Sequence, residues 1–80
     1  MKFIKEIPNN YCKVSLFAWN NKFILKFEAG MYEQTYKVNE YDVSGEDEIE
    51  EMLVDTFMIN VVSRFKSMAN DFESILDSVD

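Results

Sequence analysis

The residues with the most obvious chemical potential are a run of acids, EDEIEE, over residues 46–51. Clustered carboxylates are the ligands that Ca²⁺ prefers. The spacing does not match a calcium-binding EF-hand loop: counted from Asp42, Gly45 falls at position four instead of six, and Leu53 stands at position twelve instead of glutamate. We therefore interpret the run as the first turn of a helix, where acids favour the positive end of the helix dipole.

Cys12 is the single cysteine, and the chain has no histidine. An intrachain disulfide and a histidine-containing metal site are therefore excluded, and a cysteine nucleophile would lack an activating base. Cys12 falls on the predicted core face of a strand, where it acts as a small hydrophobic residue. No pair of carboxylates is marked as an acid–base couple. We expect no catalytic residues, no metal and no cofactor, and hence no enzymatic activity.

Charge is distributed unevenly along the chain. Residues 1–40 hold six lysines and four glutamates, a charge of +2, whereas residues 41–80 hold eleven acids against Arg64 and Lys66, a charge of −9; together they give the net charge of −7. Because affinity for nucleic acid comes from neutralising phosphates, we expect no nucleic-acid partner. An acidic inhibitor that presents its −9 half to a basic protein, as a nucleic-acid mimic, is left as an alternative.

Eighty residues, 48% hydrophobic and 15% aromatic, indicate one folded domain over residues 1–80. Its core must be thin, and small domains often gain stability by oligomerisation. No apolar run approaches the ~18 residues of a membrane span, and the N-terminus lacks the apolar stretch of a signal peptide. A lone cysteine fits a reducing compartment. We expect a cytoplasmic protein with no membrane contact.

The hydrophobic period changes from two to about 3.6 near residue 44, which predicts strands over residues 1–43 and a C-terminal helix over residues 44–79. Asn20-Asn21 suits a type I′ turn between strands at 11–20 and 22–29, and Gly30-Met31 suits a type II′ turn before a third strand at 32–38. Whether residues 2–7 add a fourth strand is left open. The predicted fold class is α+β, a three- or four-stranded antiparallel meander followed by a long helix.

The two faces of the predicted hairpin differ in composition. The inward face is wholly apolar, with Cys12, Val14, Leu16, Ala18, Phe23, Leu25, Phe27 and Ala29. The outward face still holds Phe17, Trp19, Lys22 and Ile24, which we take as a candidate interaction surface because Trp and Phe are favoured binding anchors. The register also pairs Lys13 with Glu28 and Trp19 with Lys22, so an ion pair and a cation–π contact are expected there. The alternative is that these aromatic residues only stabilise the sheet.

The predicted helix is longer than the sheet that it covers. No proline or glycine follows Gly45, so the helix extends to residue 79 and is ~50 Å long, against ~30 Å for a nine-residue strand. Ser44 and Asp47 form a weak capping box at its start. The helix must either extend beyond the sheet or break near residues 70–71, where Asn70-Asp71 offers a stop and a new N-cap.

Two apolar stripes run along this helix. The first contains Val54, Met58, Val61, Phe65, Met68, Phe72, Ile75 and Val79, with heptad spacing from Met58, and the second contains Ile49, Met52, Leu53 and Ile59. A helix on one sheet needs one stripe, so we predict a helix interface made of Ile49, Met52, Met58, Ile59, Phe65, Met68 and Phe72. In the predicted homodimer, the C-terminal half of the partner's helix also covers Phe17 and Trp19.

The sequence therefore favours a small, non-catalytic protein–protein interaction module that forms a homodimer and binds an unidentified protein partner. One alternative is a small-ligand-binding or enzyme-subunit domain with a pocket around Tyr32, Gln34 and Tyr36. The alternative to the dimer is a monomer whose helix breaks at Asn70-Asp71 and folds its last turns back over the sheet.

Overall fold

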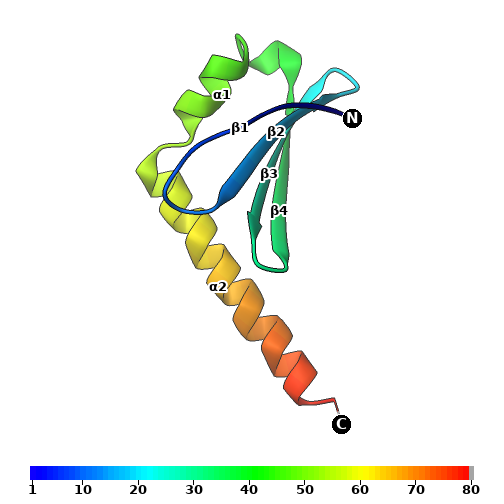
Figure 1. The fold of residues 1–80 in the computed structure, drawn as a ribbon, viewed down its shortest axis with the longest axis vertical. Coiled ribbons are helices and arrows are strands. Elements are labelled where there is room, and N and C mark those ends of the chain that lie inside the picture. Colours follow the sequence, from blue (N-terminus) through cyan, green and yellow to red (C-terminus); the bar gives the residue numbers. More distant parts are fainter. Residues whose placement is uncertain (80) are drawn as a thin grey trace.

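A computed structural model, which describes residues 1–79, shows an α+β fold of two layers, one sheet and one layer of helices (Figure 1). The elements, in chain order, are β1 (Lys2–Glu6), β2 (Lys13–Trp19), β3 (Lys22–Ala29), β4 (Tyr32–Asn39), the short 3₁₀ turn η1 (Glu40–Asp42), α1 (Glu46–Met52) and α2 (Asp55–Asp77). The sheet is an antiparallel meander in the order β1-β2-β3-β4. The predicted fold class is confirmed, and the N-terminal residues do form a fourth strand.

Both predicted hairpin turns are confirmed. Asn20 and Asn21 have φ of 53° and 62°, the left-handed conformation that a type I′ turn requires at both central positions. They set the predicted register, in which Trp19 pairs with Lys22. Gly30 has φ of 60°, as expected at the first central position of a type II′ turn. Local turn chemistry therefore determines which side chains of β2, β3 and β4 point toward the helices.

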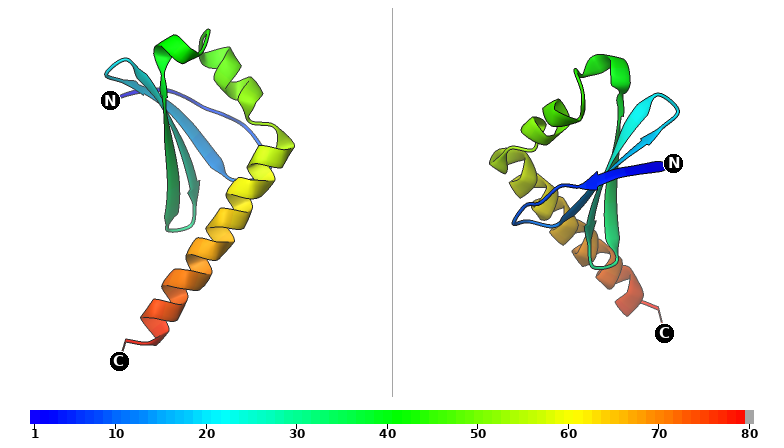
Figure 2. Two further views of the ribbon diagram at one scale, coloured as in Figure 1. Left: turned by 180° about the vertical axis from the view of Figure 1, so that it is seen from behind. Right: turned by 45° about the horizontal axis from the view of Figure 1, so that its top comes forward.

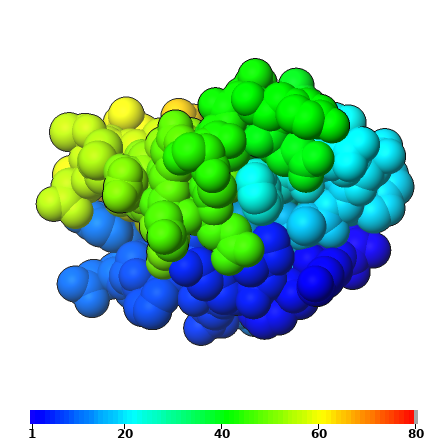
Figure 3. Space-filling model, turned by 90° about the horizontal axis from the view of Figure 1, so that it is seen from above, coloured from blue at the N-terminus to red at the C-terminus, as the bar shows by residue number. Residues whose placement is uncertain are grey.

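A register shift in β1 turns this edge strand toward the helices. Phe3 pairs with Phe17, but the next pair is Lys5 with Leu16, so the ladder is irregular at Ile4. Lys5 thereby reaches α1, where its Nζ lies 2.6 Å from Glu50 Oε2. The hydrogen bond to Glu50 raises the pKa of Lys5. Figure 3 shows the segment around α1 packed against the N-terminal strand at this end of the molecule.

The core lies between the sheet and both helices, which cover the same face of the sheet (Figure 2). Its buried members are Ile7, Val14, Leu16, Leu25, Phe27, Ile49, Met58, Val61 and Phe65. Gln34 is the polar residue among the inward side chains of β4, and its Nε2 donates a hydrogen bond to the Val61 carbonyl oxygen over 2.9 Å. A polar side chain at the edge of a core needs such a partner, and α2 supplies it.

The predicted helix is interrupted, but at Leu53-Val54 and not at Asn70-Asp71. Leu53 has ψ of 60° and Val54 has ψ of 162°, both outside the helical region. The interruption lets α1 turn so that Ile49, which a straight helix would point away from the sheet, becomes fully buried in the core. The second apolar stripe is thus partly covered within the chain itself, which corrects our expectation that another molecule must cover all of it.

The start of the helical region differs from the prediction, and the helix extends past the sheet, the first of the two expected outcomes, but ends at Asp77 instead of residue 79. The Ser44–Asp47 capping box is wrong: Gly45 is the N-cap of α1 and no side chain caps it. Ser44 instead bonds the carboxylate of Glu48. Asn70 and Asp71 lie inside the continuous helix α2, so the last turns do not fold back over the sheet.

Candidate functional site

One candidate surface is the outer face, by which we mean the face of the sheet that points away from the helices. β1 enlarges its aromatic cluster, because Phe3 packs edge-on against Phe17 with ring centroids 5.6 Å apart. Lys26 Nζ lies 5.3 Å from the centroid of Phe17 and 3.8 Å from Glu33 Oε1. Trp19 is 52% exposed. The outer face therefore presents aromatic rings together with lysine side chains.

A hollow of about 400 Å³ lies on the outer face, lined by Met1, Trp19, Ile24, Lys26, Glu33, Thr35 and Lys37. Ile24 is only 4% exposed, so it forms a floor that its neighbours already cover. Met1 and the β4 residues of this hollow were not among the residues named from the sequence. Alternation along β4 was an available signal for Thr35 and Lys37, which fall on the outer face. No such signal existed for Met1, because its position depends on β1, whose pairing was left open.

Two contacts expected on the outer face do not form. Lys13 and Glu28 are paired in the register, yet within residues 1–79 the ion pairs shorter than 4.0 Å are Lys5–Glu50 and Lys26–Glu33. The cation–π contact over the described chain is made by Lys26 on Phe17, not by Lys22 on Trp19. Trp19 is therefore not covered by a lysine and stays half exposed, and Lys22 makes no cation–π contact.

The second candidate surface is the distal segment, residues 68–79, which continues the apolar stripe of α2 past the sheet. α2 runs beyond the β3–β4 turn, and no other element of the described chain lies beside its end (Figures 1 and 2). Phe72 still contacts the sheet, with its ring centroid 6.4 Å from that of Tyr32. Phe72, Ile75, Leu76 and Val79 are each more than half exposed.

The residues of the predicted helix interface fall into two groups. Ile49, Met58 and Phe65 are buried in the chain's own core, so their contacts are intramolecular. Met52, Ile59 and Phe72 are exposed, and Met68 is half-buried against the core. The heptad stripe therefore divides along its length: its first part covers the sheet, and its second part is left to solvent.

The region proposed for a ligand pocket is occupied by contacts within the chain. Tyr36 packs against Phe27 and Phe57, with centroids 5.7 Å and 5.8 Å away, and Tyr32 packs against Phe72. The amide of Gln34 donates its hydrogen bond to α2, at the Val61 carbonyl oxygen. These three side chains fill the space between sheet and helix instead of lining a cavity there.

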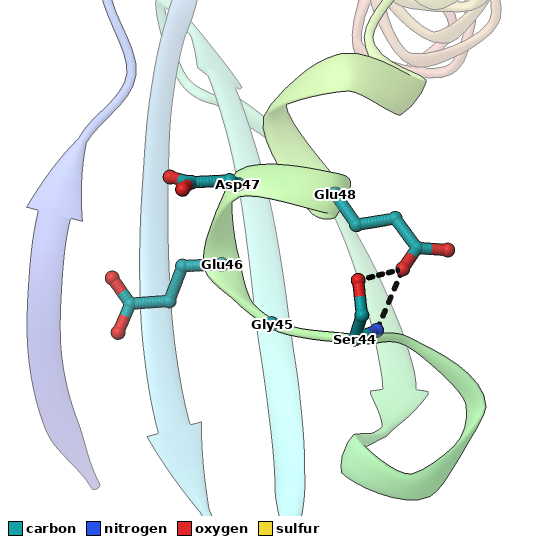
Figure 4. Close-up of a pocket in the computed structure, with 5 residues that line it drawn as sticks. All are labelled: Ser44, Gly45, Glu46, Asp47 and Glu48. Carbon is teal, nitrogen blue, oxygen red and sulfur yellow. Dashed lines mark hydrogen bonds between the residues drawn. The ribbon is translucent and has the colours of Figure 1, made fainter.

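The acidic turn is a solvated surface feature in this structure (Figure 4). Ser44 donates to Glu48 Oε2 through its backbone N–H over 2.6 Å and its hydroxyl over 2.5 Å. These bonds hold the pKa of Glu48 below its ordinary value. Glu46 and Asp47 point away from Glu48 in Figure 4, so the carboxylates do not converge. Within residues 1–79, no group of three or more potential ligands is placed to hold a metal ion.

Comparison of the chain with protein-family models, with curated proteins and with solved structures finds no match. No helix within the described residues is both long and apolar enough to cross a membrane. The fold and its surfaces define the class: a small, open two-layer α+β domain with one sheet face bare and one helix end uncovered.

Proposed function

We propose that this protein is a non-catalytic protein–protein interaction module that self-associates as a homodimer through α2. The distal segment is the observation that carries the proposal. Three large apolar side chains lie along one side of the continuous helix α2, Val79 follows just after the helix ends at Asp77, and all four are more than half exposed. Contiguous apolar surface on a rigid helix is typical of a binding site, because a groove on a partner can take up residues spaced by three and four.

A homodimer is preferred because closed two-fold assemblies are the commonest for soluble proteins. The domain also has a small core, so burying this surface would add stability that the single chain lacks. Cys12 is a free thiol, which fits a reducing compartment, and we propose the cytoplasm as the location.

The decisive experiment is the molar mass in solution by light scattering, over a range of concentrations up to tens of micromolar. We expect a mass near twice the 9.5 kDa of the chain. Replacing two exposed residues of the distal segment, in the double variant Ile75→Gln/Leu76→Gln, should return the mass to that of one chain. Both positions face solvent, so the fold should be retained, and circular dichroism would verify this.

Ile59→Gln is the matched control, because Ile59 is an exposed apolar residue of the same helix outside the distal segment. It should leave the dimer intact. A wild-type mass of one chain at every concentration would reject the homodimer. A dimer that dissociates with the Ile59 change and not with the distal change would place the interface at the bend between the helices instead.

A further inference from the structure

We propose that the receiving surface of the homodimer is the outer face: the distal segment of each copy docks on the outer face of the other, over the hollow floored by Ile24. This inference rests on the proposed function, since it names the two surfaces that meet in that dimer. In this arrangement, the two apolar regions that the single chain leaves uncovered, the distal segment and the outer face, cover each other in the dimer.

The distal segment cannot cover the outer face of its own sheet. α2 is continuous from Asp55 to Asp77 and packs on the opposite, inner side of the sheet. Without a break, its end points away from the molecule (Figure 2). The helix that covers Trp19 and Phe3 is therefore not α2 of the same chain, and a second copy provides such a helix.

The charges of the two surfaces are complementary. The distal segment carries Asp71, Glu73 and Asp77 and no basic residue. At 100° per residue, Glu73 lies on one flank of its apolar stripe and Asp71 on the other, whereas Asp77 lies on the opposite side of the helix. On the outer face, the register places Lys22, Lys26 and Lys37 around Ile24. Glu33 is the acid that lines the same hollow, and it already lies beside Lys26.

Pairing two distal segments with each other is disfavoured by the same charges. Each copy would bring Asp71 and Glu73 against the same two acids of the other copy, with no lysine or arginine after Lys66 to separate them. Like charges facing each other across an interface act against association. The outer face offers apolar contact without this repulsion.

The shapes of the two surfaces are also compatible. The hollow has an apolar floor at Ile24 and an exposed wall at Trp19, so it can take a large aliphatic side chain such as Leu76 from above. The helical part of the distal segment, residues 68–77, is ~15 Å long and ~10 Å wide, which covers less than the ~800 Å² per partner of a standard interface. Two reciprocal contacts bring the total nearer to that value, so a closed dimer is expected.

A charge exchange tests this pairing directly. The face variant carries Lys22→Glu and Lys37→Glu, and the tail variant carries Asp71→Lys and Glu73→Lys, the two acids that flank the apolar stripe. Alone, each variant opposes like charges in both contacts, so each should dimerise at least about ten-fold more weakly than wild type. Mixed in equal amounts, the two variants restore opposite charges in both contacts and should form a dimer. Formation of that dimer also shows that both variants are folded.

Lys13→Glu with Lys66→Glu is the control, because it changes the net charge as much as the face variant does, at positions that do not line the hollow. It should dimerise like wild type. If wild type is dimeric and the face variant alone is equally dimeric, the outer face is not the receiving surface, although the homodimer stands. If the mixture stays monomeric while both variants are folded, the proposed pairing is wrong. A monomeric wild type rejects the homodimer itself.

Discussion

The two halves of α2 carry one apolar stripe in different surroundings. In the first half, Met58, Val61 and Phe65 are buried against the sheet, whereas Phe72 and Ile75 in the second half are more than half exposed. The chemistry of the stripe hardly changes between them. The difference comes from length, because the 23 residues of α2 span ~34 Å and an eight-residue strand spans ~26 Å. Periodicity thus identifies the apolar side of a helix and not what covers it.

The largest expected effect contrasts Phe65→Ala with Phe72→Ala. Phe65 is buried, so its truncation should lower the free energy of unfolding by about 3–5 kcal/mol. Phe72 is half exposed, and its truncation should cost less than about 1 kcal/mol in the monomer. Urea unfolding followed by circular dichroism would measure both, at a concentration where the wild type is monomeric, because dimerisation adds apparent stability. Equal losses would contradict the division of the helix.

Amide hydrogen exchange should show the same division without mutation. We expect amides near Val61 to be on the order of 100-fold more protected than those near Ile75 in dilute solution, because an undocked helix end opens locally. Raising the concentration should slow exchange in the distal segment and leave the amides near Val61 unchanged. Uniform protection along α2 at every concentration would show that the distal segment is held within the monomer.

A smaller effect should come from Gln34, which holds the docked half of α2. Gln34→Met keeps the volume but removes the hydrogen bond to the Val61 carbonyl and the longer one that Gln34 Oε1 accepts from exposed Arg64, so a loss of about 1 kcal/mol, mainly from the first, is expected. Lys13→Met, at an exposed position of β2 that does not line the hollow, is the matched control and should stay within about 0.5 kcal/mol of wild type. Thermal unfolding of the three proteins provides the comparison, and equal stabilities would show that the hydrogen bond contributes nothing net.

The smallest effect concerns the start of the helical region and appears as a pH dependence. The pKa of Glu48 is held below its ordinary value of 4.5 by the bonds from Ser44. A depressed pKa contributes stability that is present above the unfolded pKa and is lost as pH falls through the folded pKa. Ser44→Ala should therefore lower the melting temperature slightly at neutral pH and much less in strong acid. The same deficit at both pH values would rule out Glu48 as its cause.

The hairpins were predictable because short segments determine them. Asn20-Asn21 tolerates the left-handed conformation, and the alternating apolar residues allow only one register. β1 was not predictable to the same degree, because its ladder shifts at Ile4 and the contact that holds Lys5, with Glu50, joins residues 45 positions apart. The sequence around Lys5 contains no local signal of that pair.

The position of the helix break was predicted wrongly because local sequence signals were misleading there. Asn70-Asp71 has the local chemistry of a helix end and lies within α2, whereas Leu53-Val54 has none and interrupts the helix. Tertiary packing decided the position, since the turn at Leu53 lets Ile49 and Met58 reach one core. The change of apolar side between residues 53 and 58 was the available signal. On the outer face, the register predicted the positions of Phe17 and Trp19, but not the contact between Lys26 and Phe17.

The strand order has a consequence for how the chain folds. Each strand pairs with its neighbour in sequence, so the first 39 residues contain every pairing of the sheet. Contacts between near neighbours close quickly, because little chain entropy is lost in each step. During synthesis, the meander can therefore assemble before α2 has left the ribosome, with Leu25 and Phe27 still open to solvent. We expect arrival of α2 to be the step that commits the chain to its native state, and a chain stopped before residue 55 to be prone to aggregate through this uncovered face.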